Sequence, residues 1–360
     1  MIILILVNMY SIEETIDRLN SLYLEDNIED DYIDRIKKQQ QLLLDIVANS
    51  MLDQSIDVGK INFIYDKAIS SIDAYLKGDV SMAITHIASI LEQKDNGKFV
   101  YLRHSTFFNR QEVIGYRTRK NETYDLFSKE EMMHIPNHKR YLINNQRYSL
   151  SGYPCLYFGA SIYVCWEELY RPNIDKFNVT CIRNEELIQF ADLTLPYFNA
   201  DNFNKEYLYT SIFPWLCSFK ARHKGSAFIE EYIIPQMLMS ALMNFRKRGR
   251  GGINELMAFQ GIMYTSTTYN TDKDLFKDIK LMTNYVVPIL GDKINSCGLC
   301  EYVCDYFSLT QPTSLTNERV VAEQGGIIMY DGDKQYSKYE MTEFGQLEEK
   351  LKAREFQKIE

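Results

Sequence analysis

The feature that most constrains the fold is a change of hydrophobic pattern near Phe99. From Ser11 to about Leu91, apolar residues recur at three- and four-residue steps and no proline occurs, which is typical of amphipathic helices. After Phe99 the chain contains prolines, aromatic residues and short alternating runs such as Cys155-Leu156-Tyr157-Phe158, which are typical of strands. The pattern therefore predicts an α+β fold, in which an N-terminal helical domain precedes a strand-rich domain.

Caps and turns predict where the elements and domains begin. Ser11 followed by Glu14 predicts a capping box at the first of about four helices, and the acidic turn 25–31 predicts a break. An apolar helix is expected over 228–245, and strands are expected over 261–264 and 284–287. The predicted domains are 1–95 (helical), 96–320 (strand-rich) and 321–360 (an extension). Residues 343–360 of the extension are expected to form a charged, solvated helix rather than a partner surface.

Charge and cysteine content argue against several classes of protein. The 360 residues include 49 acidic and 40 basic ones, and the net charge of −9 disfavours nucleic acid as a partner. Seven cysteines, an odd number scattered through apolar contexts, favour a reducing cytoplasm. The apolar run Ile2 to Val7 is too short to span a membrane. We interpret that run as an edge strand or the lead into a helix, unless translation begins at Met9.

Two further clusters are better explained by structural roles. Cys297, Cys300 and Cys304 could supply three ligands to zinc or an iron–sulfur cluster, but no fourth ligand is evident. Their apolar surroundings favour buried free thiols, so no metal is expected. The basic run 246–252 follows a predicted helix, where cations and glycine stabilise the C-terminal end. That role is favoured over phosphate binding.

A more specific pattern begins at Arg147. Arg147 and Tyr148 precede the turn Gly152-Tyr153-Pro154, a strand and turn contain Tyr157 and Ser161, and Glu168 follows Tyr157 by eleven residues. Upstream lies Tyr116-Arg117-x-Arg119, and downstream lies Gly261-Ile262-Met263-Tyr264-Thr265-Ser266. In this order the motifs resemble those of the RES domain family over roughly 113–288. The chain is most similar to the longer, helix-prefixed members of that family.

The resemblance implies a fold, an activity and a site. RES domains are related in fold to ADP-ribosyltransferases, which implies a mixed β-sheet core for this chain. Characterised members degrade NAD, often as toxins held in check by an antitoxin. By this resemblance Arg147, Glu168 and Ser266 form the catalytic trio. The residues expected to bind NAD are Arg147, Tyr157 and Arg117, with Arg119 as an alternative second phosphate contact. Glu167 is adjacent to Glu168, and spacing favours Glu168.

The chemistry of these side chains fits the same reaction. Cleavage of the bond between nicotinamide and ribose creates a cationic ribose, which a fixed carboxylate such as Glu168 can stabilise. Arg147 can grip a pyrophosphate with its bidentate guanidinium. Tyr157 offers an aromatic face or a hydroxyl, and Ser266 offers a hydroxyl that could orient Glu168. We expect Arg147, Tyr157, Glu168 and Ser266 to line one cleft, with no cofactor beyond NAD as substrate.

Two functions follow from these residues and motifs. The first is a cytoplasmic NAD-consuming enzyme, either a glycohydrolase, a phosphorylase or an ADP-ribosyltransferase, which acts as a bacterial toxin or defence effector. Its expected partners are NAD and an antitoxin or regulatory protein, and a homo-oligomer is possible in principle. The helical segment 11–91 is expected to pack on the catalytic domain or on a partner, because its apolar face must be buried. The alternative is a nucleotide-binding sensor or interaction protein without turnover.

Overall fold

The structure is a computed structural model, and it describes residues 9–50, 56–95, 98–107, 113–249, 259–268, 278–289, 293–316 and 339–359. The chain divides into two compact units. Unit 1 comprises Met1–Arg103 and Asp192–Glu255, and unit 2 comprises His104–Ala191 and Leu256–Glu360. This division differs from the expected domain bounds, because a segment of about sixty residues inside the expected strand-rich domain joins the N-terminal helices.

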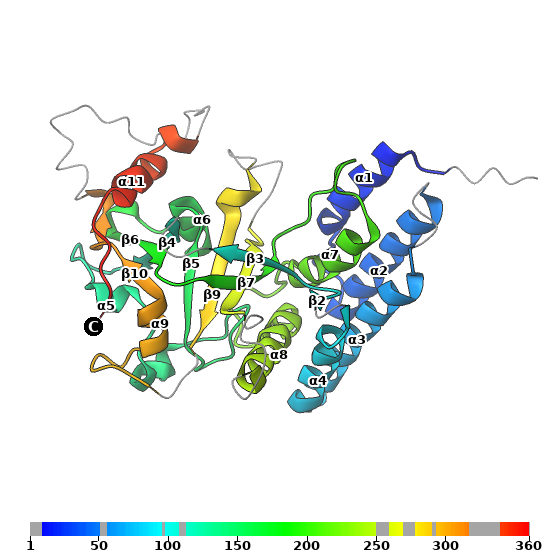
Figure 1. Cartoon of the computed structure of the whole chain (residues 1–360), viewed down its shortest axis with the longest axis horizontal. Helices are drawn as coiled ribbons and strands as arrows, with labels where there is room; N and C mark the ends of the chain where they lie inside the picture. Colours follow the sequence, from blue (N-terminus) through cyan, green and yellow to red (C-terminus); the bar gives the residue numbers. More distant parts are fainter. Residues whose placement is uncertain are drawn as a thin grey trace, which may run out of the picture. The chain divides into compact units, whose positions relative to one another are not determined.

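The described residues of the N-terminal part of unit 1 form four α-helices, as the hydrophobic pattern predicted. Their bounds are Ile12–Ser21 (α1), Tyr32–Asn49 (α2), Val58–Leu76 (α3) and Val80–Leu91 (α4) (Figure 1). The predicted capping box is present, since Ser11 and Glu14 exchange side-chain to main-chain hydrogen bonds at the start of α1. A short 3-10 helix, Leu22–Leu24, and the acidic turn separate α1 from α2.

The apolar faces of these helices are buried against the second segment of unit 1. That segment contributes α7 (Lys205–Cys217) and α8 (Ile233–Gly249), and α3 contacts both of them. A buried charge network also joins the segments, because the Arg35 guanidinium on α2 pairs with Asp26 at 2.6 Å and with Glu231. The helical N-terminal segment therefore shares its core with residues that lie more than a hundred positions downstream.

Unit 2 contains the main sheet, which confirms the α+β fold class. Its strands are β3 (Arg103–Phe107), β4 (Val113–Lys120), β5 (Cys155–Gly159), β6 (Phe177–Asn184), β7 (Ile188–Leu193), β8 (Gly261–Thr265), β9 (Thr283–Pro288), β10 (Phe307–Leu309) and β11 (Thr313–Ser314). The order is β10-β6-β4-β5-β9-β8-β7-β3, and β11 also pairs with β6. The division between units falls within β3 and β7. Both strands expected from sequence, β8 and β9, are confirmed.

Shorter elements complete the described part of the chain. They are β1 (Lys94–Asp95), β2 (Lys98–Phe99), α5 (Lys129–Met132), α6 (Ile162–Glu168), α9 (Glu301–Tyr306), α11 (Glu343–Lys352) and the 3-10 helices Asn137–Leu142, Ile174–Lys176, Glu230–Tyr232, Ile279–Met282 and Tyr339–Met341. No helix among the described residues is long and apolar enough to cross a membrane.

One face of the sheet is covered by an apolar core. Leu156 and Phe158 of β5 and Tyr285 and Val287 of β9 contribute to it, as period-two alternation along each strand requires. Cys300 and Cys304 are buried in the same core, whereas Cys297 is exposed. Among the described residues, no group of histidine, cysteine or acidic side chains could hold a metal ion. Cys300 and Cys304 therefore pack as small apolar side chains, as expected, whereas the expectation of a buried thiol was wrong for Cys297.

The C-terminal helix corrects one prediction. Residues 343–360 were expected to form a solvated charged helix, but α11 ends at Lys352 and packs against α6 and β6. Its buried residues include Leu347, Leu351 and Glu348. The apolar run Ile2 to Val7 and residues 250–252 of the basic run lie outside the described residues, as do the side chains of 246–249.

Candidate functional site

A strand, a tight turn and a helix position Glu168 in unit 2. Strand β5 lies between β4 and β9, and α6 begins three residues after β5 ends. Gly159 permits this turn, since a Cβ there would come within 2.4 Å of a Val164 methyl carbon and 2.8 Å of the Cys165 sulfur. Ser161 caps α6 by accepting the Val164 amide at 3.0 Å and donates to the Leu281 carbonyl at 2.6 Å. Glu168 is the last residue of this short helix.

The carboxylate of Glu168 is held by two buried side chains. The Ser266 hydroxyl donates to Oε1 of Glu168 at 2.6 Å, and the Asn284 amide nitrogen donates to the same oxygen at 2.9 Å. Ser266 is 2% exposed and Asn284 is 5% exposed, whereas Glu168 itself is exposed. No hydrogen bond or ion pair from the described residues reaches Oε2 of Glu168. The arrangement fixes one carboxylate oxygen and leaves the other without a partner among the described residues.

Ser266 has its own supporting contacts. It follows β8 directly, and its main-chain amide donates to the Met282 carbonyl at 2.8 Å. Its side-chain oxygen accepts the Thr268 amide at 3.1 Å and lies 2.6 Å from the Thr268 hydroxyl. Because the single proton of the Ser266 hydroxyl is donated to Glu168, the Thr268 hydroxyl must be the donor in the second contact. Thr268 thereby orients Ser266 toward the carboxylate.

The neighbouring carboxylate Glu167 has a different environment. Arg171 pairs with Glu167, with its Nη2 2.8 Å from Oε1. The turn that forms this pair contains Tyr170 and Arg171, both in the left-handed region with φ of 61° and 54°. Non-glycine residues adopt this conformation at an energetic cost, so the helix end beside Glu168 is held by its surroundings. The structure thus brings Glu168, rather than Glu167, to Ser266.

Arg147 and Tyr148 lie close to the same end of β8. Arg147 is 9% exposed, and its Nη2 donates to the Thr267 hydroxyl at 3.1 Å, one residue along the chain from Ser266. The ring of Tyr148 packs on the ring of Tyr264 with centroids 4.5 Å apart. These two contacts join the Arg-Tyr motif to the strand that leads into Ser266.

Tyr157 belongs to the same face of the sheet as Asn284. Strand register pairs Tyr157 with Val286, and pairs Asn284 with both Gly159 and Tyr264. Paired residues share a face, and alternate residues return to it, so Tyr157, Asn284 and Tyr264 lie on the face opposite the apolar core. The Tyr157 hydroxyl is 3.1 Å from the Ser149 hydroxyl, which itself donates to Gln146 at 3.0 Å. Four predicted residues, Arg147, Tyr157, Glu168 and Ser266, are thus connected through these three strands and the 146–149 turn.

Arg117 and Arg119 make contacts of another kind. Arg117 donates to the main-chain carbonyl of Tyr157 at 2.8 Å, and burial, with a smaller effect of Arg119, lowers the pKa of Arg117 to about 10. Arg119 donates to the Glu131 carbonyl and lies over the Phe127 ring, 4.4 Å from its centroid. No described contact joins either arginine to Glu168, Ser266 or Arg147. These described partners, two main-chain carbonyls and an aromatic ring, give both arginines a structural role. Phosphate binding by Arg117 stays a prediction.

Sequence reasoning missed Asn284. The run 284–287 was interpreted only as a strand, because three apolar residues follow the asparagine. The available signal was a lone amide side chain in an otherwise apolar strand, since buried polar groups in such positions are normally hydrogen-bonded to a specific partner.

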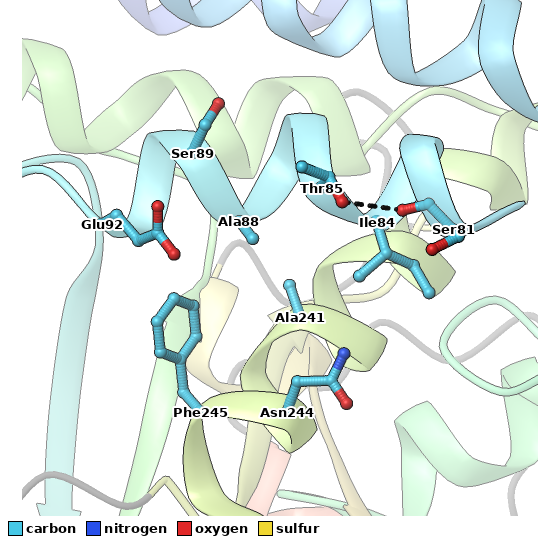
Figure 2. Close-up of a pocket in the computed structure, with 9 residues that line it drawn as sticks. All are labelled: Ser81, Ile84, Thr85, Ala88, Ser89, Glu92, Ala241, Asn244 and Phe245. Carbon is cyan, nitrogen blue, oxygen red and sulfur yellow. Dashed lines mark hydrogen bonds between the residues drawn. The ribbon is translucent and has the colours of Figure 1, made fainter. Parts of the chain in front are cut away.

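The pocket shown in Figure 2 lies in unit 1, apart from these residues. It has a volume of about 250 Å³ and lies between α4, which contributes Ser81, Thr85 and Ser89, and α8, which contributes Asn244 and Phe245; Glu92, the C-cap of α4, also lines it. None of its lining residues is a cation that could bind a phosphate. The pocket therefore does not fit a dinucleotide, and none of the predicted site residues lines it.

Comparison with known proteins gives a relative that is named as a putative toxin. The chain is 28% identical over 317 residues to the protein named "Putative toxin YopC" from Bacillus subtilis (strain 168). The match covers 80% of this chain and 64% of that protein, so the chain spans less than two thirds of the relative's length. No family model matches the chain, and no solved structure matches it significantly. The similarity supports a toxin-like role.

Proposed function

We propose that the chain is an NAD-consuming enzyme that cleaves the bond between nicotinamide and ribose. The observation that carries this proposal is the Glu168 carboxylate, which two buried donors hold by one oxygen while the other oxygen has no described partner. A fixed negative charge of this kind stabilises a developing cation more effectively than a mobile one, because its orientation is set before the reaction begins.

The reaction needs little else from the protein. The electron pair of the broken bond leaves with nicotinamide, which becomes neutral, and positive charge develops on the ribose beside Glu168. An acceptor then supplies a lone pair to the same ribose carbon. Water gives ADP-ribose, phosphate gives its phosphorylated form, and a protein side chain gives a modified protein. Arg147 would hold the pyrophosphate with its guanidinium, and Tyr157 would contact nicotinamide or ribose.

The RES resemblance and the relative's name support a biological role as a toxin. The motif residues Arg147, Tyr157, Glu168 and Ser266 lie on connected elements, as members of one site must, and a relative carries a toxin name. We propose that the chain depletes NAD in the cytoplasm and that an antitoxin or regulatory protein controls it. All seven cysteines are free, which supports a reducing compartment.

Nicotinamide release from NAD tests the proposal. The purified chain is incubated with NAD alone, with inorganic phosphate or with candidate acceptor proteins, and free nicotinamide is measured in each case. Release in at least one condition is expected, and the condition identifies the acceptor. Absence of release in all three, together with calorimetric binding of intact NAD, would instead indicate the nucleotide-binding sensor.

A further inference from the structure

The helix that carries Glu168 is also held at its opposite end. Helix α6 has seven residues, so its first residue, Ile162, is less than two turns from Glu168. A helix this short moves as a rigid body, and a shift at Ile162 is transmitted to the carboxylate. The contacts at the first turn of α6 therefore bear on the position of Glu168.

The contact at Ile162 comes from the C-terminal helix. The main-chain amide of Ile162 donates to Oε1 of Glu348 at 2.6 Å, although the two residues are 186 positions apart. The Tyr339 hydroxyl donates to the same oxygen. Glu348 is 6% exposed, so solvent cannot easily replace this acceptor. The amide at the start of α6, which no residue inside the helix can accept, thus depends on a side chain of α11.

A second contact joins the same two helices. The Phe344 ring of α11 lies against the Trp166 ring of α6, with centroids 5.6 Å apart. Phe344 and Glu348 are four residues apart on α11, and Ile162 and Trp166 are four residues apart on α6. This spacing places each pair on one helix face, so α11 contacts α6 along one continuous face.

We propose that Glu348 is a positioning residue: through Ile162 it holds α6 where Glu168 meets Ser266 and Asn284. The C-terminal segment 339–352 is then part of the site rather than a tail. The catalytic consequence of the Glu348 contact rests on the proposed NAD cleavage, whereas the effect of that contact on α6 does not. Loss of the acceptor loosens the first turn of α6 and removes Glu168 from its two donors for part of the time.

Hydrogen exchange in the full chain tests the positioning role without any assay of activity. Glu348→Ala is expected to speed exchange of the α6 amides at least about tenfold, because the helix loses its contact at Ile162. Glu348→Gln keeps an oxygen acceptor at the same reach and should not speed exchange of the α6 amides relative to wild type. Glu348→Asp, one methylene shorter, should resemble Glu348→Ala. Glu349→Ala is the matched control, because Glu349 is exposed and pairs with Lys352 at 2.6 Å.

Kinetics then separate positioning from general destabilisation. For NAD cleavage, Glu348→Ala should lower kcat at least about tenfold with KM within about twofold, since substrate contacts are kept while the carboxylate is misplaced. Leu351→Ala removes a fully buried side chain of α11 and leaves the Ile162 contact intact. Unchanged α6 exchange in Glu348→Ala would overturn the proposal, as would an equal effect of Leu351→Ala at the same loss of Tm. An inactive wild type would refute NAD cleavage and leave the exchange test standing.

Discussion

The hydroxyl of Ser266 donates a 2.6 Å hydrogen bond to Oε1 of Glu168 across 98 residues of sequence. The Thr268 amide and hydroxyl occupy the acceptor side of the same Ser266 oxygen, so the serine proton is committed to the carboxylate. Asn284 binds the same carboxylate oxygen from the adjacent strand. The Ser-Glu pair is therefore a preorganised unit, whose geometry is set by β8, β9 and α6 together.

Replacement of Glu168 by glutamine is expected to lower the rate of nicotinamide release at least about a hundredfold. Glutamine keeps the shape and an oxygen that can accept from Ser266 and Asn284, but it lacks the negative charge that stabilises the ribose cation in the proposed reaction. KM for NAD should change little. The measurement is steady-state nicotinamide release by the two purified proteins, with bacterial growth on expression as a second readout.

Glu167→Gln provides the matched control for this prediction. Glu167 has the same chemistry as its neighbour but pairs with Arg171 instead of Ser266. Its replacement should leave the rate within about threefold of wild type, because an ion pair near the surface contributes little. Full activity in Glu168→Gln together with loss in Glu167→Gln would move the catalytic role to Glu167.

Asn284 should act only through Glu168. Asn284→Ala removes one of the two donors to Oε1, and a lost hydrogen bond to a charged group corresponds to roughly a tenfold fall in kcat. In a Glu168→Gln background the same change should have much less effect, since the charge that Asn284 orients is gone. A double-mutant cycle on kcat measures this coupling. Additive losses would indicate that Asn284 contributes independently of Glu168.

Much of the fold could be predicted from local sequence patterns. The four N-terminal helices, the Ser11 capping box and strands β8 and β9 all follow from residue spacing over a few turns or positions. The link between Glu168 and Ser266 could be suggested only by family resemblance, because no local signal relates residues so far apart. The family resemblance did not point to Asn284, whose role depends on a contact across 116 residues.

The missed features share a physical cause. Glu348 lies in a run with Glu349 and Lys350, which predicts a solvated helix, yet its carboxylate is buried because Ile162 and Tyr339 both donate to it. Residues 192–255 belong to the same unit as the N-terminal helices, and no local pattern predicts this long-range packing either. A deletion of residues 11–91 would therefore expose the faces of α7 and α8 that contact α3 and α4.

Arg147→Ala should impair substrate binding as well as turnover. A guanidinium that grips the pyrophosphate acts in the ground state and in the transition state, so KM for NAD should rise and kcat/KM should fall at least about a hundredfold. Arg147→Lys keeps the charge but loses the bidentate geometry and should recover only part of this loss. Arg171→Ala is the control, since that arginine is exposed and pairs with Glu167. Unchanged KM in Arg147→Ala would contradict the assigned role.

His134 should make the folded state sensitive to acid. It is almost fully buried, its Nε2 accepts the Cys300 amide at 2.9 Å, and its Nδ1 therefore donates to the Ile135 carbonyl. Burial is the main reason that the pKa of His134 lies below its ordinary value of 6.5. As pH falls, His134 takes up a proton in the unfolded chain before it does so in the folded state. The stability that neutral His134 contributes is therefore present above pH 6.5 and is lost as pH falls below that value. Urea unfolding of wild type and His134→Gln from pH 8 to 5 should show a weaker acid dependence in the variant.

Glu348 should give the stability of the folded state the opposite pH dependence. Burial raises the pKa of Glu348 from 4.5 to about 7, although Tyr339, Ile162 and Lys352 oppose the shift. The titratable groups around it are Tyr339, Tyr116 of β4, Cys165 of α6, Cys181 of β6, and Glu349 and Lys352 of α11. The neutral form is favoured in the folded state, so the stabilisation is complete below pH 4.5 and is lost as pH rises through about 7.

The magnitude follows from the size of that shift. A displacement from 4.5 to about 7 corresponds to about 3 kcal/mol of unfolding free energy between the two ends of the range. Glu348→Gln is neutral at every pH and should not lose this stability, so it should exceed wild type above pH 7 and approach it near pH 4.5. Urea unfolding of both proteins across this range measures the difference, and Glu349→Gln controls for the loss of one acidic charge. A difference between Glu348→Gln and wild type that stays constant with pH would show that Glu348 titrates in the folded protein as it does in the unfolded chain.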